Sequence, residues 1–296
     1  MIRGTIIKGI SGFYYVKTGA DVRTCKARGI FKKDGSIPLV GDEVTIRMRE
    51  EDEGLVERIL PRRNEFVRPP IANIDLFIAV VALANPSPNP EILDRFLVTA
   101  EAAGVNAVVC VNKTDLSGGR DYMETVYAPI YPTVFVSAKT GEGTERLRSL
   151  MHNRRVAFAG PSGVGKTCLI KRFVADEALI TGEVSERTGR GRHTTRHVEI
   201  FDTDFGAAIY DTPGYTAFEG ATSLAADARL DAYFPEIGFA SEGCRFDDCR
   251  HMNEPGCAVT AALRDGLIAK SRYESYARLL SETERRTSEE RRRKTK

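Results

Sequence analysis

Residues 160–167 read Gly-Pro-Ser-Gly-Val-Gly-Lys-Thr and follow an apolar stretch that is typical of a β-strand. A glycine-rich turn of this kind directs backbone N–H groups towards phosphate oxygens, and the helix behind it adds its partial positive charge. The lysine neutralises the terminal phosphates and the last hydroxyl ligates magnesium. An ordinary strand-to-helix turn is the alternative. We predict a phosphate loop that runs into a helix and comprises Gly160, Pro161, Ser162, Gly163, Val164, Gly165, Lys166, Thr167 and Cys168.

A second loop has residues that could read the base of a nucleotide. It follows the apolar run 107–111 and consists of Asn112, Lys113, Thr114 and Asp115. A carboxylate such as Asp115 accepts hydrogen bonds from guanine N1–H and from the N2 amino group, whereas adenine presents no such pair of donors. The sequence therefore favours GTP over ATP. A weaker signal is the loop of Ser137, Ala138 and Lys139, which resembles the one that backs the base in GTPases.

Two further segments could contact magnesium and the γ-phosphate. Asp211 opens an Asp-Thr-Pro-Gly segment directly after a predicted strand, and Gly214 ends it. The carboxylate can hold a magnesium-bound water, and the glycine N–H can contact the γ-phosphate. In the segment 188–197, Thr195 or Thr194 would complete the magnesium shell, and we favour Thr195. A solvated basic loop is the alternative for that segment.

Three of the six cysteines crowd around one histidine, with the spacing Cys-x4-Cys-x-His-x5-Cys. Three thiolates and one imidazole form a closed tetrahedral set for Zn²⁺, which is typical of a structural site. The alternative, buried cysteines that act as small apolar residues, suits Cys25, Cys110 and Cys168 better. We predict one zinc ion held by Cys244, Cys249, His251 and Cys257.

The motifs occur in an unusual order. An ordinary GTPase begins with the phosphate loop and ends with the two base-binding loops, whereas here 112–115 and 137–139 precede 160–167. We therefore predict a circularly permuted P-loop GTPase domain. Its buried strands alternate with helical stretches, which indicates a mostly parallel sheet.

The fold class is predicted to be α/β and multidomain. Residues 1–66 contain short β-rich pieces broken by glycine, which indicate a small β-barrel of the oligonucleotide-binding (OB) type. Prolines in 62–70 suggest a linker. The permuted domain would span 67–220, and a helical zinc-binding domain would span 221–296. The barrel could contact RNA, or it could be a packed domain with a solvated basic face.

Composition sets outer bounds on function. With 296 residues, 42% hydrophobic and 28% charged, the chain has an ordinary globular composition, and a net charge of +2 does not by itself require nucleic acid. The longest apolar run, 76–84, is far shorter than the roughly 20 residues of a membrane helix. We find no signal peptide, so we expect a soluble, cytoplasmic monomer without a membrane partner.

Taken together, the barrel, the permuted motifs and the cysteine spacing resemble the ribosome small-subunit-dependent GTPase A family of bacteria. The resemblance covers nearly the whole chain. It implies a GTPase that is stimulated by the small (30S) ribosomal subunit, binds 16S rRNA and acts late in maturation of that subunit. Two other functions remain open, namely a GTPase without a ribosomal partner and an RNA-binding scaffold with a vestigial nucleotide site.

The resemblance also implies a catalytic residue. Many GTPases carry a glutamine that orients water after the Asp-x-x-Gly segment, but here Tyr215 stands in that region. Family members carry a histidine just before the threonines of the segment that corresponds to 188–197, which matches His193, so we assign His193 to positioning the attacking water. An exposed loop histidine is the alternative. Arg196 stands where the family often repeats threonine, which leaves the choice of magnesium ligand open.

Overall fold

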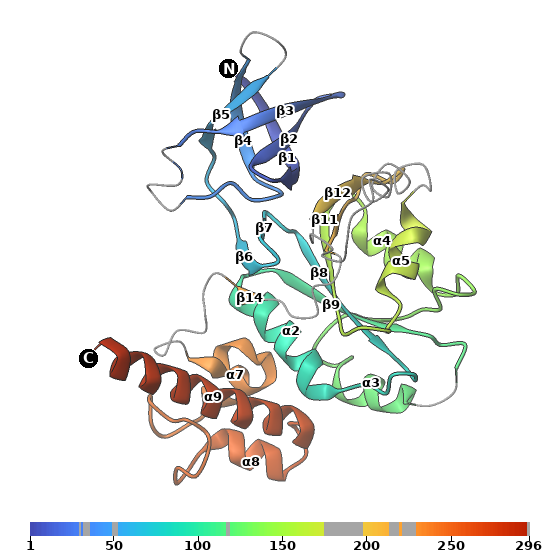
Figure 1. Cartoon of the computed structure of the whole chain (residues 1–296). Coiled ribbons are helices and arrows are strands. Elements are labelled where there is room, and N and C mark those ends of the chain that lie inside the picture. Colours follow the sequence, from blue (N-terminus) through green and yellow to red (C-terminus); the bar gives the residue numbers. More distant parts are fainter. Residues whose placement is uncertain are drawn as a thin grey trace.

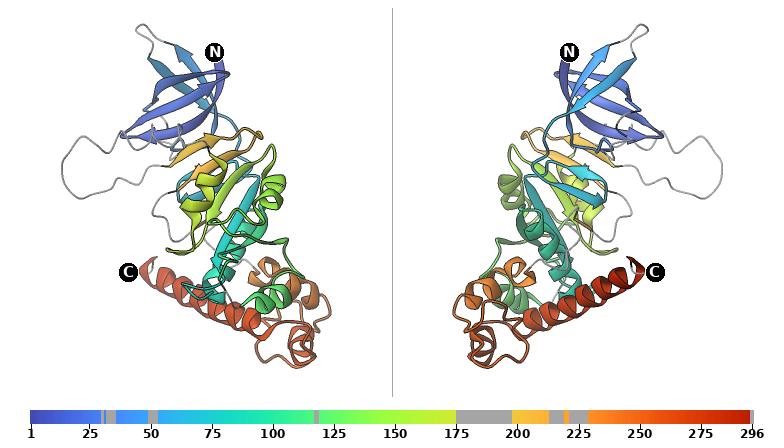
Figure 2. Two further views of the ribbon diagram at one scale, coloured as in Figure 1. Left: turned by 90° about the vertical axis from the view of Figure 1, so that its right-hand side faces the viewer. Right: turned by 90° about the vertical axis from the view of Figure 1, so that its left-hand side faces the viewer.

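The computed structural model contains an amino-terminal barrel, a central sheet flanked by helices, and a carboxyl-terminal group of helices, which follow one another along the molecule (Figures 1 and 2). It describes residues 1–29, 31, 36–48, 53–116, 119–174, 198–212, 219–220 and 229–294. Across these ranges no helix combines the length and apolar character needed to cross a bilayer.

The barrel is a β-sheet that closes on itself. Its strands are β1 (Ile2–Ile10), β2 (Phe13–Thr18), β3 (Asp21–Ala27), β4 (Glu43–Met48) and β5 (Gly54–Ile59). Strand β1 pairs antiparallel with both β2 and β4, and β3 runs parallel to β5, so the order of neighbours returns to its start. The interior is filled by apolar side chains that include Ile6, Val16, Cys25, Val44, Ile46 and Val56. The predicted small OB-type barrel is confirmed.

The central sheet is mostly parallel, as predicted. Its strands are β8 (Leu76–Ala82), β9 (Asn106–Asn112), β10 (Thr133–Phe135), β11 (Arg155–Ala159), β12 (Glu199–Asp202) and β13 (Ala208–Asp211). They lie in the order β10-β9-β8-β11-β13-β12, and only the pairing of β12 with β13 is antiparallel among these strands. Strands β9 and β10, which lead into the predicted base-reading loops, thus lie in the same sheet as β11, which leads into the predicted phosphate loop, with β8 between β9 and β11. They do so although they precede β11 in the chain.

Helices cover both faces of this sheet (Figure 1). They are α2 (Pro90–Ala102), α3 (Arg120–Val126), α4 (Thr144–Met151) and α5 (Lys166–Phe173). Successive residues of β8 point to opposite faces: Phe77 packs in the core that contains Leu93 of α2, and Ile78 packs in the core that contains Leu169 of α5. Every residue of β8 is buried, which explains its uninterrupted apolar sequence.

The segment 62–70, which the prolines suggested to be a linker, is ordered structure instead. It contains β6 (Glu65–Arg68), which forms a hairpin with β7 (Ile71–Ala72) and pairs on its other side with β14 (Glu219–Gly220). Arg62 fixes the start of this segment, because its guanidinium donates to the buried Asp42 carboxylate at 2.7 and 2.8 Å. The prolines therefore mark a turn between two short strands.

The barrel is joined to the edge of the central sheet. Strand β1 pairs antiparallel with β12, so the two sheets are hydrogen-bonded neighbours. Arg155 at the start of β11 forms an ion pair with Glu43 of the barrel. Gly41 lies where a Cβ atom would be only 2.1 Å from the Ala72 carbonyl oxygen, so no larger residue fits at this junction.

The carboxyl-terminal part is helical, as predicted. It comprises the 3-10 helix η3 (Leu230–Tyr233) and the helices α7 (Pro235–Ser241), α8 (Ala258–Arg264) and α9 (Lys270–Lys294). A small core at its centre includes Leu230, Phe234, Ile237, Val259 and Tyr276. Helix α9 packs along α2 of the central domain, which attaches this part to the sheet (Figures 1 and 2).

A buried arginine holds this attachment together. Arg272 of α9 is fully buried and donates to Asp94 of α2 at 2.7 Å and to Glu236 of α7 at 2.7 and 3.1 Å. Its guanidinium also lies 4.7 Å from the centre of the Phe234 ring. Such a network is stable only when complete, because an isolated buried charge is costly.

We predict that Arg272→Ala lowers the free energy of unfolding by about 3–5 kcal/mol, because it leaves two carboxylates without their buried partner. Arg278→Ala is the matched control on the same helix: it breaks the exposed pair with Glu91 and should cost less than about 1 kcal/mol. Urea denaturation measures both. Equal losses for the two variants would contradict the role given to Arg272.

Candidate nucleotide site and metal centre

The described loops with predicted nucleotide contacts lie at one edge of the central sheet (Figure 1). They follow β9, β10 and β11, and Asp211 ends β13; these four strands run parallel within the sheet. The carboxyl ends of parallel strands share one edge, where ligands of open α/β sheets bind. The fold therefore brings together segments that are far apart in the sequence.

Asn112 connects three of these loops. This side chain ends β9 and is only 1% exposed. Its Nδ2 donates to the Val164 carbonyl of the phosphate loop at 2.7 Å, and its Oδ1 accepts from the Ala138 N–H at 2.9 Å. A Cβ atom on Gly165 would be 2.3 Å from Asn112 Nδ2, and the φ of +94° also favours glycine there.

Lys166 lies over the phosphate loop that precedes it. Its Nζ donates to the carbonyl oxygens of Gly160 at 2.6 Å and Pro161 at 2.9 Å. Burial lowers the pKa of this amine. Lys166 is also the first residue of α5, whose initial N–H groups have no partners within the helix. Four other predicted residues of this loop and of the first turn of α5 are exposed, namely Ser162, Gly163, Thr167 and Cys168.

The Asp115 carboxylate is exposed at the same edge and is held by one side chain. Ser137 Oγ donates to Asp115 Oδ1 at 2.7 Å, and Ser137 Oγ itself accepts from the Thr140 N–H at 3.1 Å. The Ser137 hydrogen bond holds the pKa of Asp115 below its usual value, with smaller contributions from Lys139 and Lys113. The carboxylate is therefore ionised at neutral pH and fixed in orientation.

Helix α5 supports the base-reading loops as well as the phosphate loop. Arg172 near its end donates to the carbonyl oxygens of Ala138 at 2.8 Å and Lys139 at 2.5 Å.

In the first base-reading loop, Lys113 has a positive φ of +66°, and Thr114 beside it is half-buried. The loop 112–115 is thus a tight turn directly after its strand.

Asp211 ends β13 at the same edge. Burial raises the pKa of its carboxyl group, and the negative charge of Glu199, its partner on β12, raises it further. Four further residues predicted for the magnesium and hydrolysis site lie outside the described residues, namely His193, Thr194, Thr195 and Gly214.

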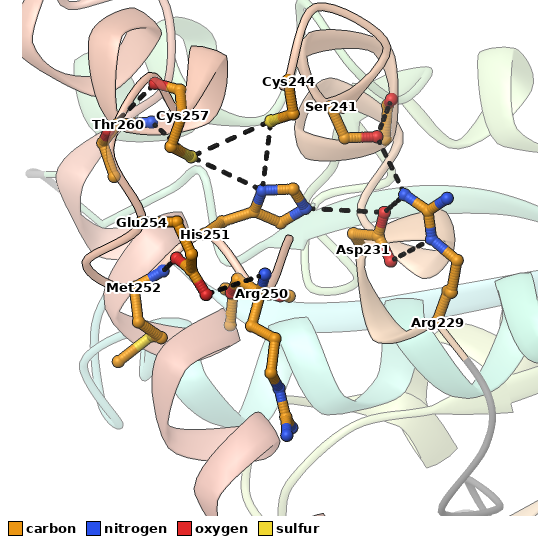
Figure 3. A network of polar contacts seen from close by, with 12 residues as sticks. Arg229, Asp231, Ser241, Cys244, Arg250, His251, Met252, Glu254, Cys257 and Thr260 are labelled. Carbon is orange, nitrogen blue, oxygen red and sulfur yellow. Dashed lines mark hydrogen bonds and ion pairs between the residues drawn. The ribbon is translucent and has the colours of Figure 1, made fainter. Parts of the chain in front are cut away.

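The predicted metal ligands come together in the carboxyl-terminal part (Figure 3). The ligand atoms of Cys244, Cys249, His251 and Cys257 all lie within 4.8 Å of one another. His251 Nδ1 is 3.5 Å from the sulfur atoms of both Cys244 and Cys257, and those two sulfurs are 3.9 Å apart. His251 is fully buried. The cluster could therefore hold one metal ion.

The histidine of this cluster is oriented from behind. Its Nε2 lies 3.6 Å from Asp231 Oδ2, and the Arg229 guanidinium forms an ion pair with the same oxygen at 2.6 Å (Figure 3). The His251 carbonyl accepts from Tyr273 of α9 at 2.6 Å. In the turn that follows, Glu254 accepts three backbone N–H groups at 2.9–3.1 Å. A carboxylate behind a ligating histidine is the usual arrangement at metal sites.

Comparison with known proteins decides the family. A family model described as RsgA GTPase matches residues 59–221, and one described as RsgA N-terminal domain matches residues 3–56. A relative from Caldanaerobacter subterraneus subsp. tengcongensis, named small ribosomal subunit biogenesis GTPase RsgA, is 47% identical over 285 residues, which cover 95% of each chain. The chain belongs to the RsgA GTPase family. It is therefore a GTP-hydrolysing enzyme.

A further relative and two solved structures extend the match to the whole fold. A relative of the same name from Carboxydothermus hydrogenoformans is 43% identical over 98% of this chain and 99% of its own. The crystal structure of YjeQ from Thermotoga maritima is 33% identical, with a TM-score of 0.76 over 95% of this chain and 98% of that one. YloQ, described as a circularly permuted GTPase, is 33% identical, with a TM-score of 0.75 over 97% of this chain and 96% of that one. The predicted permutation is confirmed.

Several residues around the RsgA-family site were not found from the sequence. Arg172 donates to a backbone carbonyl of the loop 137–139, and Asp231 contacts His251, 20 residues further along the chain. No local sequence pattern indicates either contact. Asn112 was predicted as a residue of the base-reading loop, and the contacts of its buried amide with Val164 and Ala138 add a role in holding loops together.

Proposed function

We propose that this enzyme couples GTP hydrolysis to late maturation of the small ribosomal subunit, and that the subunit stimulates hydrolysis. Relatives that match it nearly from end to end are named for biogenesis of that subunit. The observation that carries the nucleotide side of the proposal is the buried Asn112 side chain, which joins the phosphate loop to the base-reading loops. A ligand that spans both ends of this edge would stabilise all three loops at once.

The phosphates would be bound by residues 160–168. Lys166 would neutralise them, and its present partners, two backbone carbonyls, are weaker acceptors than phosphate oxygens. Burial lowers the pKa of the Lys166 amine, and the negative charge of a triphosphate would favour its protonated form. Asp115, ionised and oriented by Ser137, would accept from guanine N1–H and the N2 amino group.

Magnesium would be held beside the phosphates by Thr167 and Asp211, with Thr195, or alternatively Thr194, completing the shell in the GTP state. The donor set fits this ion, because hydroxyl and carboxylate oxygens are the ligands that hard cations prefer. When bound, the ion supplies charge neutralisation at the phosphates.

Hydrolysis would depend on residues of the segments 188–197 and 211–214, together with Lys166. His193 would position the attacking water. Another residue is needed for this role because Tyr215, and not the usual glutamine, follows Gly214. The Gly214 N–H would contact the γ-phosphate, and Lys166 would stabilise charge that develops on it.

For the metal centre we propose Zn²⁺. A tetrahedral site with zinc–sulfur bonds of about 2.3 Å and a zinc–nitrogen bond of about 2.0 Å has edges of about 3.8 Å between sulfurs and about 3.5 Å between sulfur and nitrogen. The 3.9 Å between the sulfurs of Cys244 and Cys257 fits the first value, and the 3.5 Å from each sulfur to His251 Nδ1 fits the second. Four protein ligands would close the site, which favours a structural role.

The flanking parts would bind 16S rRNA. Helix α9 carries exposed basic residues close to its end, namely Arg285, Arg286, Arg292 and Arg293. A barrel of the OB type at the opposite end offers a second surface of a kind that binds oligonucleotides. We propose a cytoplasmic monomer with parts at 1–66, 67–220 and 221–296 that grips the subunit at both ends.

The proposal predicts that adding small ribosomal subunits raises the GTP hydrolysis rate at least about tenfold, because completing a GTPase site from outside can be worth about 10³–10⁵ in rate. Lys166→Ala should abolish the stimulated rate, whereas Lys171→Ala, an exposed lysine of the same helix, should retain it. A phosphate-release assay with titrated subunits measures this. Equal rates with and without subunits would contradict the ribosomal coupling.

Zinc is tested separately. We expect about one zinc ion per chain by elemental analysis, lost in Cys257→Ser and retained in Cys168→Ser, since Cys168 is an exposed residue of α5. The first variant should also unfold at a lower temperature, because metal binding contributes to folding of such small units. Freshly purified protein that contains no zinc would refute this assignment.

A further inference from the structure

A row of three charged side chains runs from the barrel to the nucleotide edge of the sheet. Lys8 of β1 is the register partner of Glu199 of β12, and Glu199 is the register partner of Asp211 of β13. Directly opposed residues of antiparallel strands place their side chains on the same face of a sheet. The row therefore reads positive, negative, negative, and its last member is the carboxylate proposed to hold magnesium.

The first contact in the row is short and shielded from water. Lys8 Nζ lies 2.6 Å from Glu199 Oε2, and the two side chains are only 16% and 24% exposed. A bulge in β1 makes this contact possible. Strand alternation would put Lys8 on the same face as Ile6, which is fully buried in the barrel, but the pairing with β2 shifts by one residue between them.

The second contact in the row is between like charges. Side chains directly opposite one another in an antiparallel pair have Cβ atoms about 4.5–5.5 Å apart, and like charges at that position repel. A cation near either carboxylate relieves the repulsion. Lys8 supplies one such charge from the barrel, and a metal ion bound at Asp211 would supply another from the nucleotide side.

We propose that the barrel tunes the magnesium affinity of the nucleotide site through this row: Glu199 strengthens the attraction of Mg²⁺ to Asp211, and Lys8 weakens it. The inference rests on the proposed function, in which Asp211 holds magnesium. Because coupling between sites is reciprocal, magnesium bound at Asp211 also weakens the Lys8–Glu199 contact and so loosens the seat of the barrel on β12. Lys8 and Glu199 act through Asp211, and are positioning residues.

The same interface contains a matched control. Lys17 of β2 forms an ion pair with Asp202 at the other end of β12, at 2.5 Å. The register partner of Asp202 on β13 is Ala208, which carries no charge. This pair therefore bridges the barrel and β12 without facing Asp211.

The test is a Mg²⁺ titration of GDP binding, followed by the fluorescence of a labelled GDP and by calorimetry on the full chain. Lys8→Met should lower the Mg²⁺ concentration for half-saturation by roughly three- to tenfold, and Glu199→Gln should raise it by a similar factor, as expected for a unit charge within about one Debye length. Lys8→Arg, which keeps the charge, and Lys17→Met should leave it within about twofold.

A second reading separates electrostatics from damage to the fold. In the absence of magnesium the ligand is the GDP anion, so each variant should have the opposite effect on binding. Lys8→Met should weaken GDP binding, and Glu199→Gln should strengthen it. Loss of structure would weaken both kinds of binding together. Equal effects of Lys8→Met and Lys17→Met, or the same sign with and without magnesium, would overturn the proposal.

Asp211→Asn distinguishes this inference from the function on which it rests. If Asp211→Asn raises the magnesium requirement while the Lys8 and Glu199 variants do not change it, the charge row is wrong and the magnesium site stands. If Asp211→Asn has no effect either, the proposed magnesium role of Asp211 fails and the inference fails with it.

Discussion

The nucleotide edge of this protein depends on two hydrogen bonds made by one buried amide. Asn112 reaches Val164, 52 residues further along the chain, and Ala138, 26 residues further along. Because these segments lie far apart in the chain, the Asn112 side chain supplies contacts between loops that the local backbone does not connect. A buried amide that loses such partners costs about 1–3 kcal/mol, which gives the arrangement a single favoured geometry.

Charged side chains attach the other two parts to this centre, and they do so in different environments. On the carboxyl-terminal side, Arg272 is fully buried between Asp94 and Glu236, a contact that tolerates no loosening. On the barrel side, the Lys8–Glu199 pair is largely but not fully buried, and it lies beside Asp211, the carboxylate proposed to hold magnesium. The helical part is thus attached to α2 through a buried network, whereas the barrel contacts β12 beside the proposed magnesium site.

Sequence alone predicted what is encoded locally. The phosphate loop, the Asn-Lys-Thr-Asp turn and the cysteine spacing depend on residues close together in the chain, and the order of these motifs predicted the permutation. It failed where partners are distant. Prolines around 62–70 suggested a linker, because nothing nearby shows that β6 pairs with β14. Arg272 looks like a surface residue of a basic helix until Asp94 and Glu236 are placed around it, and Asp231 has no spacing that connects it with His251.

One guanine nucleotide is proposed to span the edge from Lys166 to Asp115, and exchanging the base-reading group tests this proposal most directly. Binding of GDP and of xanthosine diphosphate should be measured for the native chain and for Asp115→Asn. An amide can donate to the O2 of xanthine where the carboxylate accepted from the guanine amino group. The variant is expected to lose GDP affinity by at least about tenfold and to prefer the xanthine nucleotide. An unchanged preference for guanine would show that Asp115 does not read the base, and the proposed arrangement of the site would be wrong.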